Sequence, residues 1–183
     1  MDPITSEITI ARPREEVFEY LADIANHAEF TDHFRVDWRL TREDTYGVGA
    51  GARYRVRRRF PFNRFMYADV TFTEVARPRL IVERGRTGKF NRNLTRGVWE
   101  LEETAGAGTR VRYTVETKPK LLSDKLMEAL GRARGWFRRR NGKALRRLGL
   151  ILEEGLQRGH RPTIAGGARK PASAYRFRPD PKS

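Results

Sequence analysis

Histidine is the first side chain to consider for proton transfer or metal binding, because the pKa of a free imidazole lies close to neutral pH. The chain contains three histidines, His27, His33 and His160. A metal site can be drawn around His27, which follows Asp23 by four residues on an expected short helix. Its further candidate ligands are Glu29, Asp32 and His33. No second cluster completes the set, so we predict no metal, and His33 is kept as a candidate general base at the mouth of a pocket.

Other catalytic signatures are missing from the sequence. The chain has no cysteine, which excludes disulfides and thiol nucleophiles. No serine stands in a G-x-S-x-G context, and no glycine-rich loop ends in Lys-Ser or Lys-Thr. The segment 47–52, GVGAGA, leads into an expected strand instead of a phosphate-binding helix, so it is interpreted as a turn. The catalytic residues are therefore unknown from the sequence, and no cofactor is predicted.

The N-terminal segment predicts one strand followed by two short helices. Apolar and polar residues alternate along the strand with period 2, and its inward set is Ile4, Ser6, Ile8 and Ile10. Pro13 suits the first turn of a helix, where its missing N–H costs no hydrogen bond. Asp23 is the expected N-cap of a second helix that ends near Phe30. This second helix is too short to be stable alone, so it must pack against a larger element.

This segment, ITIARPREEVFEYLADIANHAEFTDHF, resembles the opening of the START-like helix-grip (SRPBCC) superfamily. That superfamily includes polyketide cyclases/dehydrases, ubiquinone-binding proteins and lipid-transfer domains. The resemblance covers about Pro3 to Gln157 in element order. It implies a strand, two small helices, a curved antiparallel sheet and one long C-terminal helix that together enclose an apolar cavity. Its motifs are diffuse, so it implies a fold more than a reaction.

The middle of the chain predicts a sheet. Alternating segments separated by turns follow one another without room for crossover helices, so we expect about seven strands in a bent antiparallel sheet. The fold class is therefore α+β. The expected inward sets are Phe34, Val36, Trp38 and Leu40; Ala52, Tyr54 and Val56; Met66, Ala68, Val70 and Phe72; Leu80 and Val82; and Val111, Tyr113 and Val115, with a further strand at 98–103. Segment 84–96 predicts either an extended hairpin end or a mobile loop.

Residues 121–157 predict one long helix with a kink near Gly131 or Gly135. At about 100° per residue, one arc is apolar and should face the sheet; it holds Leu126, Leu130, Ala133, Phe137, Ala144, Leu148 and Ile151. The opposite side carries a cationic stripe of Arg132, Arg139, Arg140, Lys143, Arg146 and Arg147. Glycines 131, 135, 142 and 149 form a third line, for which close approach of a backbone or ligand and simple tolerance of glycine are both open.

The net charge of +15 is concentrated at the C-terminal end. Residues 118–183 hold 18 of the 38 Lys and Arg residues but 5 of the 23 Asp and Glu residues. An anionic partner should therefore meet the protein there, and an anionic membrane surface is one such partner; nucleic acid is disfavoured, because no recognition motif accompanies the charges. Residues 158–183 form a basic tail that contains Pro and Gly and is expected to be disordered, outside a domain at 1–157.

The space between sheet and helix is the expected working part. Its candidate ligand contacts are Tyr54, Arg58, Phe72, Trp99, Tyr113, Arg134 and Phe137. Arg58 continues an inward-facing set. Arg134 falls within the apolar arc, where it either meets a ligand head group or pairs with a sheet carboxylate such as Asp69 or Glu83. For the aromatic candidates, ligand contact and plain core packing are both open, and Val98 competes with Trp99 for the inward position.

Three functional hypotheses follow. The first is binding or transfer of a hydrophobic small molecule, such as a lipid, a quinone or an aromatic polyketide. The second, implied by the resemblance, is a cyclase or dehydratase that positions a folded substrate. The third is association with nucleic acid or membrane through the basic helix and tail. The absence of long apolar segments and of an apolar secretory segment at the N-terminus predicts a cytoplasmic protein, with peripheral membrane attachment as an alternative. The oligomeric state stays unknown.

Overall fold

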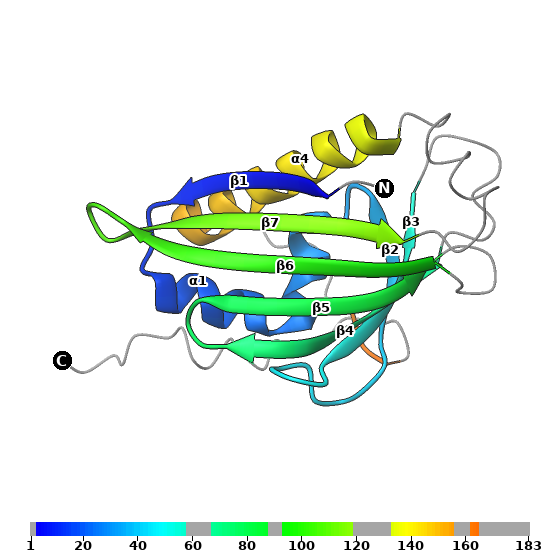
Figure 1. Ribbon diagram of the computed structural model, residues 1–183. Coiled ribbons are helices and arrows are strands. Elements are labelled where there is room, and N and C mark those ends of the chain that lie inside the picture. Colours follow the sequence, from blue (N-terminus) through cyan, green and yellow to red (C-terminus); the bar gives the residue numbers. More distant parts are fainter. Residues whose placement is uncertain (1–2, 58–66, 88–92, 119–132, 156–161, 165–183) are drawn as a thin grey trace.

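The computed structural model describes residues 3–57, 67–87, 93–118, 133–155 and 162–164 (Figure 1). The predicted N-terminal order is confirmed: β1 (Ile4–Ile10), α1 (Arg14–Ala22), the 3-10 turn η1 (Ile24–Asn26) and α2 (His27–Thr31). The following elements are β2 (Arg35–Leu40), β3 (Gly51–Val56), β4 (Tyr67–Ala76), β5 (Leu80–Thr87), β6 (Asn93–Thr104), β7 (Gly108–Lys118) and α4 (Ala133–Glu154). None of the described helices is both long and apolar enough to span a bilayer.

The seven described strands form one antiparallel sheet in the order β1-β7-β6-β5-β4-β3-β2. This sheet curls, and the helices lie behind it in the view of Figure 1, with α4 running alongside the edge strand β1. The predicted α+β helix-grip class is therefore confirmed. Apolar side chains of α1, η1 and α2 pack with the inner face of the sheet into one core.

A β-bulge in β2 changes one position of a predicted inward set, in which Phe34, Trp38 and Leu40 are buried. Val36 pairs with Arg55 and the next pair is Arg39 with Arg53, so two residues of β2 oppose Tyr54 alone. Asp37 adopts a positive φ of 55° at this point. The bulge shifts the alternation: Trp38 and Leu40 are buried as predicted, but Arg35 takes the inward position and Val36 is only half-buried. A strict period of 2 cannot describe a strand with an inserted residue.

The hairpin of β5 and β6 extends further than the apolar pattern suggests. Arg84 pairs with Arg96, and Thr87 pairs with Asn93. Of the two alternatives for segment 84–96, the extended hairpin end is confirmed, while its tip at 88–92 lies outside the described residues. Trp99, and not Val98, takes the inward position of β6. Long paired strands here bring inward-facing residues of β5, β6 and β7 side by side.

Helix α4 is held against the sheet at both its inner face and its C-terminal end. Ala144, Leu145, Leu148 and Ile151 are buried, which confirms the apolar arc over the described part of the helix. Arg12 donates from Nε to the carbonyl of Leu152 (2.9 Å) and from Nη2 to that of Glu153 (3.2 Å). These bonds satisfy carbonyls that have no partner within the helix, and they place a cation at the negative end of its dipole.

The glycines of α4 do not share one role. A Cβ on Gly149 would lie 3.3 Å from Ile8 Cδ1, so this glycine allows close approach of β1. A Cβ on Gly135 or Gly142 would meet only an arginine Nη1 of α4 itself, at 3.9 Å. Close packing against β1 therefore accounts for a glycine at position 149 but not at positions 135 and 142. The expected kink near Gly131 and the predicted helix start at 121 lie outside the described residues.

A short described piece of the tail reaches the edge of the sheet. The backbone N–H of Leu40, on the edge strand β2, donates to the carbonyl of Thr163 at 3.0 Å, and Pro162 is buried. Residues 162–164 therefore lie against the edge of the sheet opposite to β1. Nearly all of the rest of the predicted tail lies outside the described residues.

Candidate ligand-binding site

The centre of the inner sheet face carries an aromatic pair beside a buried acid. Trp99 of β6 lies directly opposite Tyr113 of β7, and their rings stack with centroids 4.0 Å apart and an interplanar angle of 24°. Glu83 of β5 lies opposite Gly97 of β6. A Cβ on Gly97 would overlap the Glu83 carboxyl group and lie 2.6 Å from its Cγ. Gly97 thus leaves the space through which the Glu83 side chain crosses β6.

A chain of polar contacts connects four strands across this face. Tyr113 Oη donates to Glu83 Oε1 at 2.6 Å, because an ionised carboxylate only accepts. Tyr113 Oη therefore serves as the acceptor for Arg35 Nη2, at 3.3 Å. Trp99 Nε1 approaches Glu83 Oε2 at 3.5 Å, a long contact on the same carboxylate. We name Arg35, Glu83, Trp99 and Tyr113 the inner polar cluster.

Arg35 is the most unusual member of the inner polar cluster. Its side chain is 7% exposed, and its Cζ lies 4.9 Å from the centroid of the Tyr54 ring and 5.3 Å from that of Phe34. Burial alone would lower the pKa of Arg35, but the nearby Tyr54, Tyr113 and Glu83 outweigh it and raise the pKa, so the guanidinium is charged. Arg35 has five N–H groups. Among the described residues, Tyr113 Oη is the one hydrogen-bond acceptor for them.

The two tyrosines of the site stay protonated at neutral pH. Burial raises the pKa of Tyr113, and the Glu83 charge raises it further, against the lowering effect of Arg35. Burial likewise raises the pKa of Tyr54, whose ring lies 4.6 Å from that of Trp38. The site therefore combines a fixed cation, a carboxylate and two neutral phenols, which suits recognition of a polar group on an otherwise apolar molecule.

His27 lies beside the cluster, at the start of α2. Its ring is surrounded by Phe30, Phe72 and Trp99, with centroids 5.3, 5.5 and 5.3 Å away. Because the carbonyl of Leu21 can only accept, His27 Nε2 is the protonated nitrogen of the 2.9 Å bond to that carbonyl. Burial lowers the pKa of His27, although the Glu83 charge opposes this effect. The ring is therefore neutral at pH 7.

Two unsatisfied polar atoms lie where α4 meets the segment between α2 and β2. Asn141 is 2% exposed, on the buried side of the helix, and its Nδ2 has no hydrogen-bond partner among the described residues. His33 donates from Nε2 to the carbonyl of Arg140, the residue before Asn141, at 3.2 Å, and its Nδ1 is buried without a described partner. Buried polar groups are normally paired, so such atoms indicate positions where a ligand or solvent can supply the partner.

The structure brings together four of the seven residues predicted as ligand contacts. Tyr54, Phe72, Trp99 and Tyr113 are all buried in the core that includes the inner sheet face. Phe137 is half-buried on α4, 4.9 Å from Trp136, whose ring is 6.0 Å from Phe34. Whether any of these seven contacts a ligand stays a prediction.

Of the two predicted cations, only Arg134 belongs to the described residues. Arg134 is exposed on α4, and the carboxylates expected to pair with it are engaged elsewhere: Asp69 with Arg53 at 2.6 Å, and Glu83 with Tyr113. Arg58 lies outside the described residues. His33 contacts α4 through the Arg140 carbonyl, and its role as a base stays a prediction.

Sequence reasoning missed Arg35, considered Glu83 only as an ion-pair partner for Arg134, and treated His27 only as a metal ligand. Arg35 becomes inward-facing through the bulge. Glu83 directly follows the apolar run Leu80 to Val82, in which the alternating pattern assigned Leu80 and Val82 to the inward face. The available signal for Glu83 was Gly97, a glycine inside a strand pattern, which often marks close approach of another group. Among the described residues, no three His, Asp or Glu side chains are grouped so that they could hold a metal ion.

Comparison with known proteins assigns the chain to a family. The model of the family described as polyketide cyclase / dehydrase and lipid transport matches residues 1–153. The chain therefore belongs to this family. No curated protein matches its sequence.

Solved structures of the same fold are distant in sequence. DR_A0006 from Deinococcus radiodurans is 17% identical, with 84% of this chain and 99% of that chain covered and a TM-score of 0.57. TTHA0849 from Thermus thermophilus is 13% identical, with 85% and 99% covered and a TM-score of 0.61. DynU16, a putative protein in the dynemicin biosynthetic locus, is 19% identical, with 85% of this chain but 48% of that chain covered and a TM-score of 0.54. At these identities the likeness establishes the fold alone.

Proposed function

We propose that the protein binds a hydrophobic small molecule, such as a lipid, a quinone or an aromatic polyketide, in a cavity between the inner sheet face and α4. Membership of a family of polyketide cyclases, dehydrases and lipid-transport proteins supports this class of ligand. The observation that carries the proposal is Arg35, a buried and charged guanidinium to which the described residues offer one acceptor. A charged group with so few partners is costly unless something else satisfies it.

In this proposal Arg35 binds the polar end of the ligand. Arg35 donates to a carbonyl, carboxylate or phenolate oxygen, while Tyr113 stays oriented by its 2.6 Å bond to Glu83. The Tyr54 ring lines the same side, since the Arg35 guanidinium lies over it, and the Trp38 ring packs against Tyr54. From the helix side, the amide of Asn141 offers a second donor. The apolar part of the ligand would then lie along the buried aromatic residues.

Native mass spectrometry of the protein purified from its own host tests this proposal. We expect an added mass that solvent extraction removes, belonging to a mainly apolar molecule with at least one acceptor oxygen. The matched control is the Arg35→Met variant prepared in parallel, which keeps most of the volume of the side chain but loses all five donors. The proposal fails if the wild-type protein carries no added mass and binds none of a lipid, a quinone or an aromatic polyketide offered to it.

An enzyme of the cyclase or dehydratase type is the second candidate. A charged guanidinium can hold a carbonyl oxygen and stabilise negative charge that develops on it during ring closure. The fold neighbour DynU16 comes from a biosynthetic locus, which supports a link to such chemistry for that protein. Incubation with a linear poly-β-ketone separates the candidates: binding without turnover supports the first, whereas cyclised or dehydrated product supports the second.

A further inference from the structure

Helix α4 carries a row of basic side chains for which the described residues provide no ion-pair partner. Its exposed side includes Arg138, Arg139, Lys143 and Arg146, which we name the α4 cationic face. The helix contains no Asp or Glu between Ala133 and Leu152. No carboxylate among the described residues forms an ion pair with these four side chains. Their charges therefore add along one side of a single helix instead of cancelling.

Two other basic residues of the predicted stripe have different roles. Arg147 forms an ion pair with Asp32 at 2.9 Å and so fastens α4 to the end of α2. Arg140 is half-buried and lies over the Trp136 ring, with its Cζ 5.5 Å from the centroid. Arg132 lies outside the described residues. The structural role of Arg147 and Arg140 separates them from the α4 cationic face.

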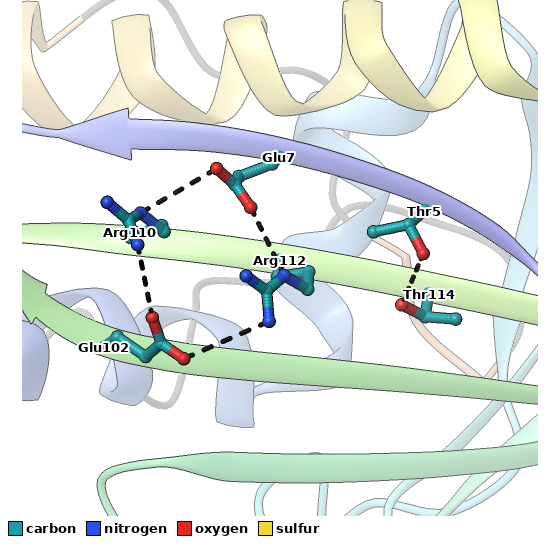
Figure 2. A network of polar contacts seen from close by, with 6 residues as sticks. All are labelled: Thr5, Glu7, Glu102, Arg110, Arg112 and Thr114. Atoms are coloured by element: carbon teal, nitrogen blue, oxygen red, sulfur yellow. Dashed lines mark hydrogen bonds and ion pairs between the residues drawn. The ribbon is translucent and has the colours of Figure 1, made fainter.

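The part of the outer sheet face over β1, β6 and β7 shows the contrasting arrangement. There Glu7 and Glu102 alternate in space with Arg110 and Arg112, and all four side chains are linked (Figure 2). Their N–O separations run from 3.2 Å, for Arg112 with Glu7, to 4.0 Å, for Arg112 with Glu102. Such a neutralised surface has little attraction for a distant anion.

We propose that the α4 cationic face docks on a membrane surface rich in anionic lipid. The inner side of α4 is packed on β1 and α2, so the helix lies flat on the body of the protein with its outer side free to meet a plane. Leu150 lies on this outer side and is 39% exposed, which adds an apolar contact at the level of the headgroups. Basic residues on a helix that lies in the interface attract anionic headgroups in an additive way.

The same face is poorly suited to reading nucleic acid. The described residues of α4 that are exposed include no Asn, Gln, Ser or Thr, the side chains that supplement arginine in contacts with bases and sugars. A membrane needs only charge and a shallow apolar contact, and the α4 cationic face with Leu150 supplies both. This inference concerns the outer side of α4 and does not depend on the ligand proposed for its inner side.

Vesicle flotation with the full-length chain tests the proposal. The vesicles are phosphatidylcholine alone, or phosphatidylcholine with an equal amount of phosphatidylglycerol. We expect flotation only with the anionic vesicles and a steep loss with added salt, because screening weakens each charge. The triple variant Arg139→Gln/Lys143→Gln/Arg146→Gln should lower the partition coefficient about a hundredfold, since each cation near the surface contributes about fivefold.

The matched control removes three charges elsewhere. Arg84, Arg86 and Arg96 are exposed on β5 and β6, so Arg84→Gln/Arg86→Gln/Arg96→Gln gives the same net charge and should stay within about threefold of the wild type. Thermal melts monitored by circular dichroism confirm folding, and Lys143→Glu replaces the α4 triple if that variant does not fold. Absence of binding to anionic vesicles, equal losses in both triples, or binding only to duplex DNA would overturn the proposal.

Discussion

Tyr113 of β7 donates its hydroxyl proton to Glu83 of β5 across the intervening strand β6, at 2.6 Å. The two residues can meet because Gly97 of β6 has no side chain between them. This bond fixes the tyrosine hydroxyl as an acceptor for Arg35 and so connects the bulged strand β2 to the far half of the sheet. The inner polar cluster therefore depends on residue 97 being glycine, which has no side chain to block the bond.

Gly97→Ala should destabilise the protein and disrupt the inner polar cluster. The added Cβ would overlap the Glu83 carboxyl group, and forcing the side chain aside costs about 1–3 kcal/mol. Urea unfolding followed by tryptophan fluorescence measures the change in the free energy of unfolding. The control is Gly142→Ala, where the new Cβ would meet only the end of an arginine side chain and should raise stability by up to about 1 kcal/mol. Equal effects of the two substitutions would contradict the assigned role of Gly97.

Tyr113→Phe should cost about 1–3 kcal/mol of unfolding free energy, because Glu83 loses its closest donor and Arg35 its acceptor while all three positions stay buried. Thr114→Val is the comparison on the same strand. The Thr114 hydroxyl lies on the outer face, 3.0 Å from that of Thr5 (Figure 2), and its loss should change stability by less than about 0.5 kcal/mol. Chemical denaturation of both variants provides the measurement, and a Tyr113→Phe change as small as that of Thr114→Val would exclude a structural role for the bond.

Arg35 and Glu83 should behave as coupled charges. Arg35→Met removes the cation and leaves the buried carboxylate, which should cost about 3–5 kcal/mol. Glu83→Gln removes the opposite charge and leaves the guanidinium. The double variant should lose less than the sum of the two, with a coupling of about 0.5–3 kcal/mol in a double-mutant cycle of unfolding free energies. Strict additivity would show that the two charges do not interact through Tyr113.

His27 should make the protein less stable in mild acid. Its pKa in the folded protein is lowered by burial, below the 6.5 of a free imidazole. As pH falls below about 6.5, the unfolded chain takes up a proton that the folded chain does not, so the unfolding free energy decreases. The decrease ends once pH passes below the lowered pKa of the folded state. Above pH 6.5 both states are neutral at this site, and it makes no difference to stability.

Unfolding curves between about pH 7.5 and 5 for the wild type and His27→Gln test this sign. The glutamine amide can still donate to the Leu21 carbonyl but does not titrate. The difference in unfolding free energy between the two proteins should shift in favour of the variant as pH falls, by up to about 1.4 kcal/mol per pH unit. A difference that stays constant over this range would mean that His27 is protonated equally in both states.

Alternation and helical spacing were sufficient to predict most of the fold. The strand before Pro13, the N-cap at Asp23 and the apolar arc of α4 all follow from local patterns, because each element buries one side against a shared core. The N-cap is confirmed by the bond from the Ala25 backbone N–H to Asp23 Oδ1, at 3.1 Å. Such patterns indicate which face of an element is buried. In a sheet with one buried face, every strand shows the same alternation of apolar and polar residues.

The polar centre could not be predicted in the same way. Arg35 faces inward only because Asp37 adopts a positive φ and shifts the register of β2, and aspartate in one strand does not by itself signal a bulge. Glu83 and Tyr113 come together across two strand pairings that link positions far apart in the chain. The aromatic candidates were within reach of sequence reasoning, but the charges that give the site its chemistry depend on three-dimensional register.

The central claim is that Arg35 binds the polar end of an apolar ligand. Its most direct test is native mass spectrometry of wild-type and Arg35→Met protein purified from the same host, with the amount of co-purifying small molecule measured after solvent extraction. We predict that the wild type retains a mainly apolar molecule containing an acceptor oxygen and that folded Arg35→Met retains at least about tenfold less, as expected when a charge-assisted hydrogen bond is lost. Equal retention by the two proteins, or a wild type that retains no molecule and binds none of a lipid, a quinone or an aromatic polyketide, would contradict the account.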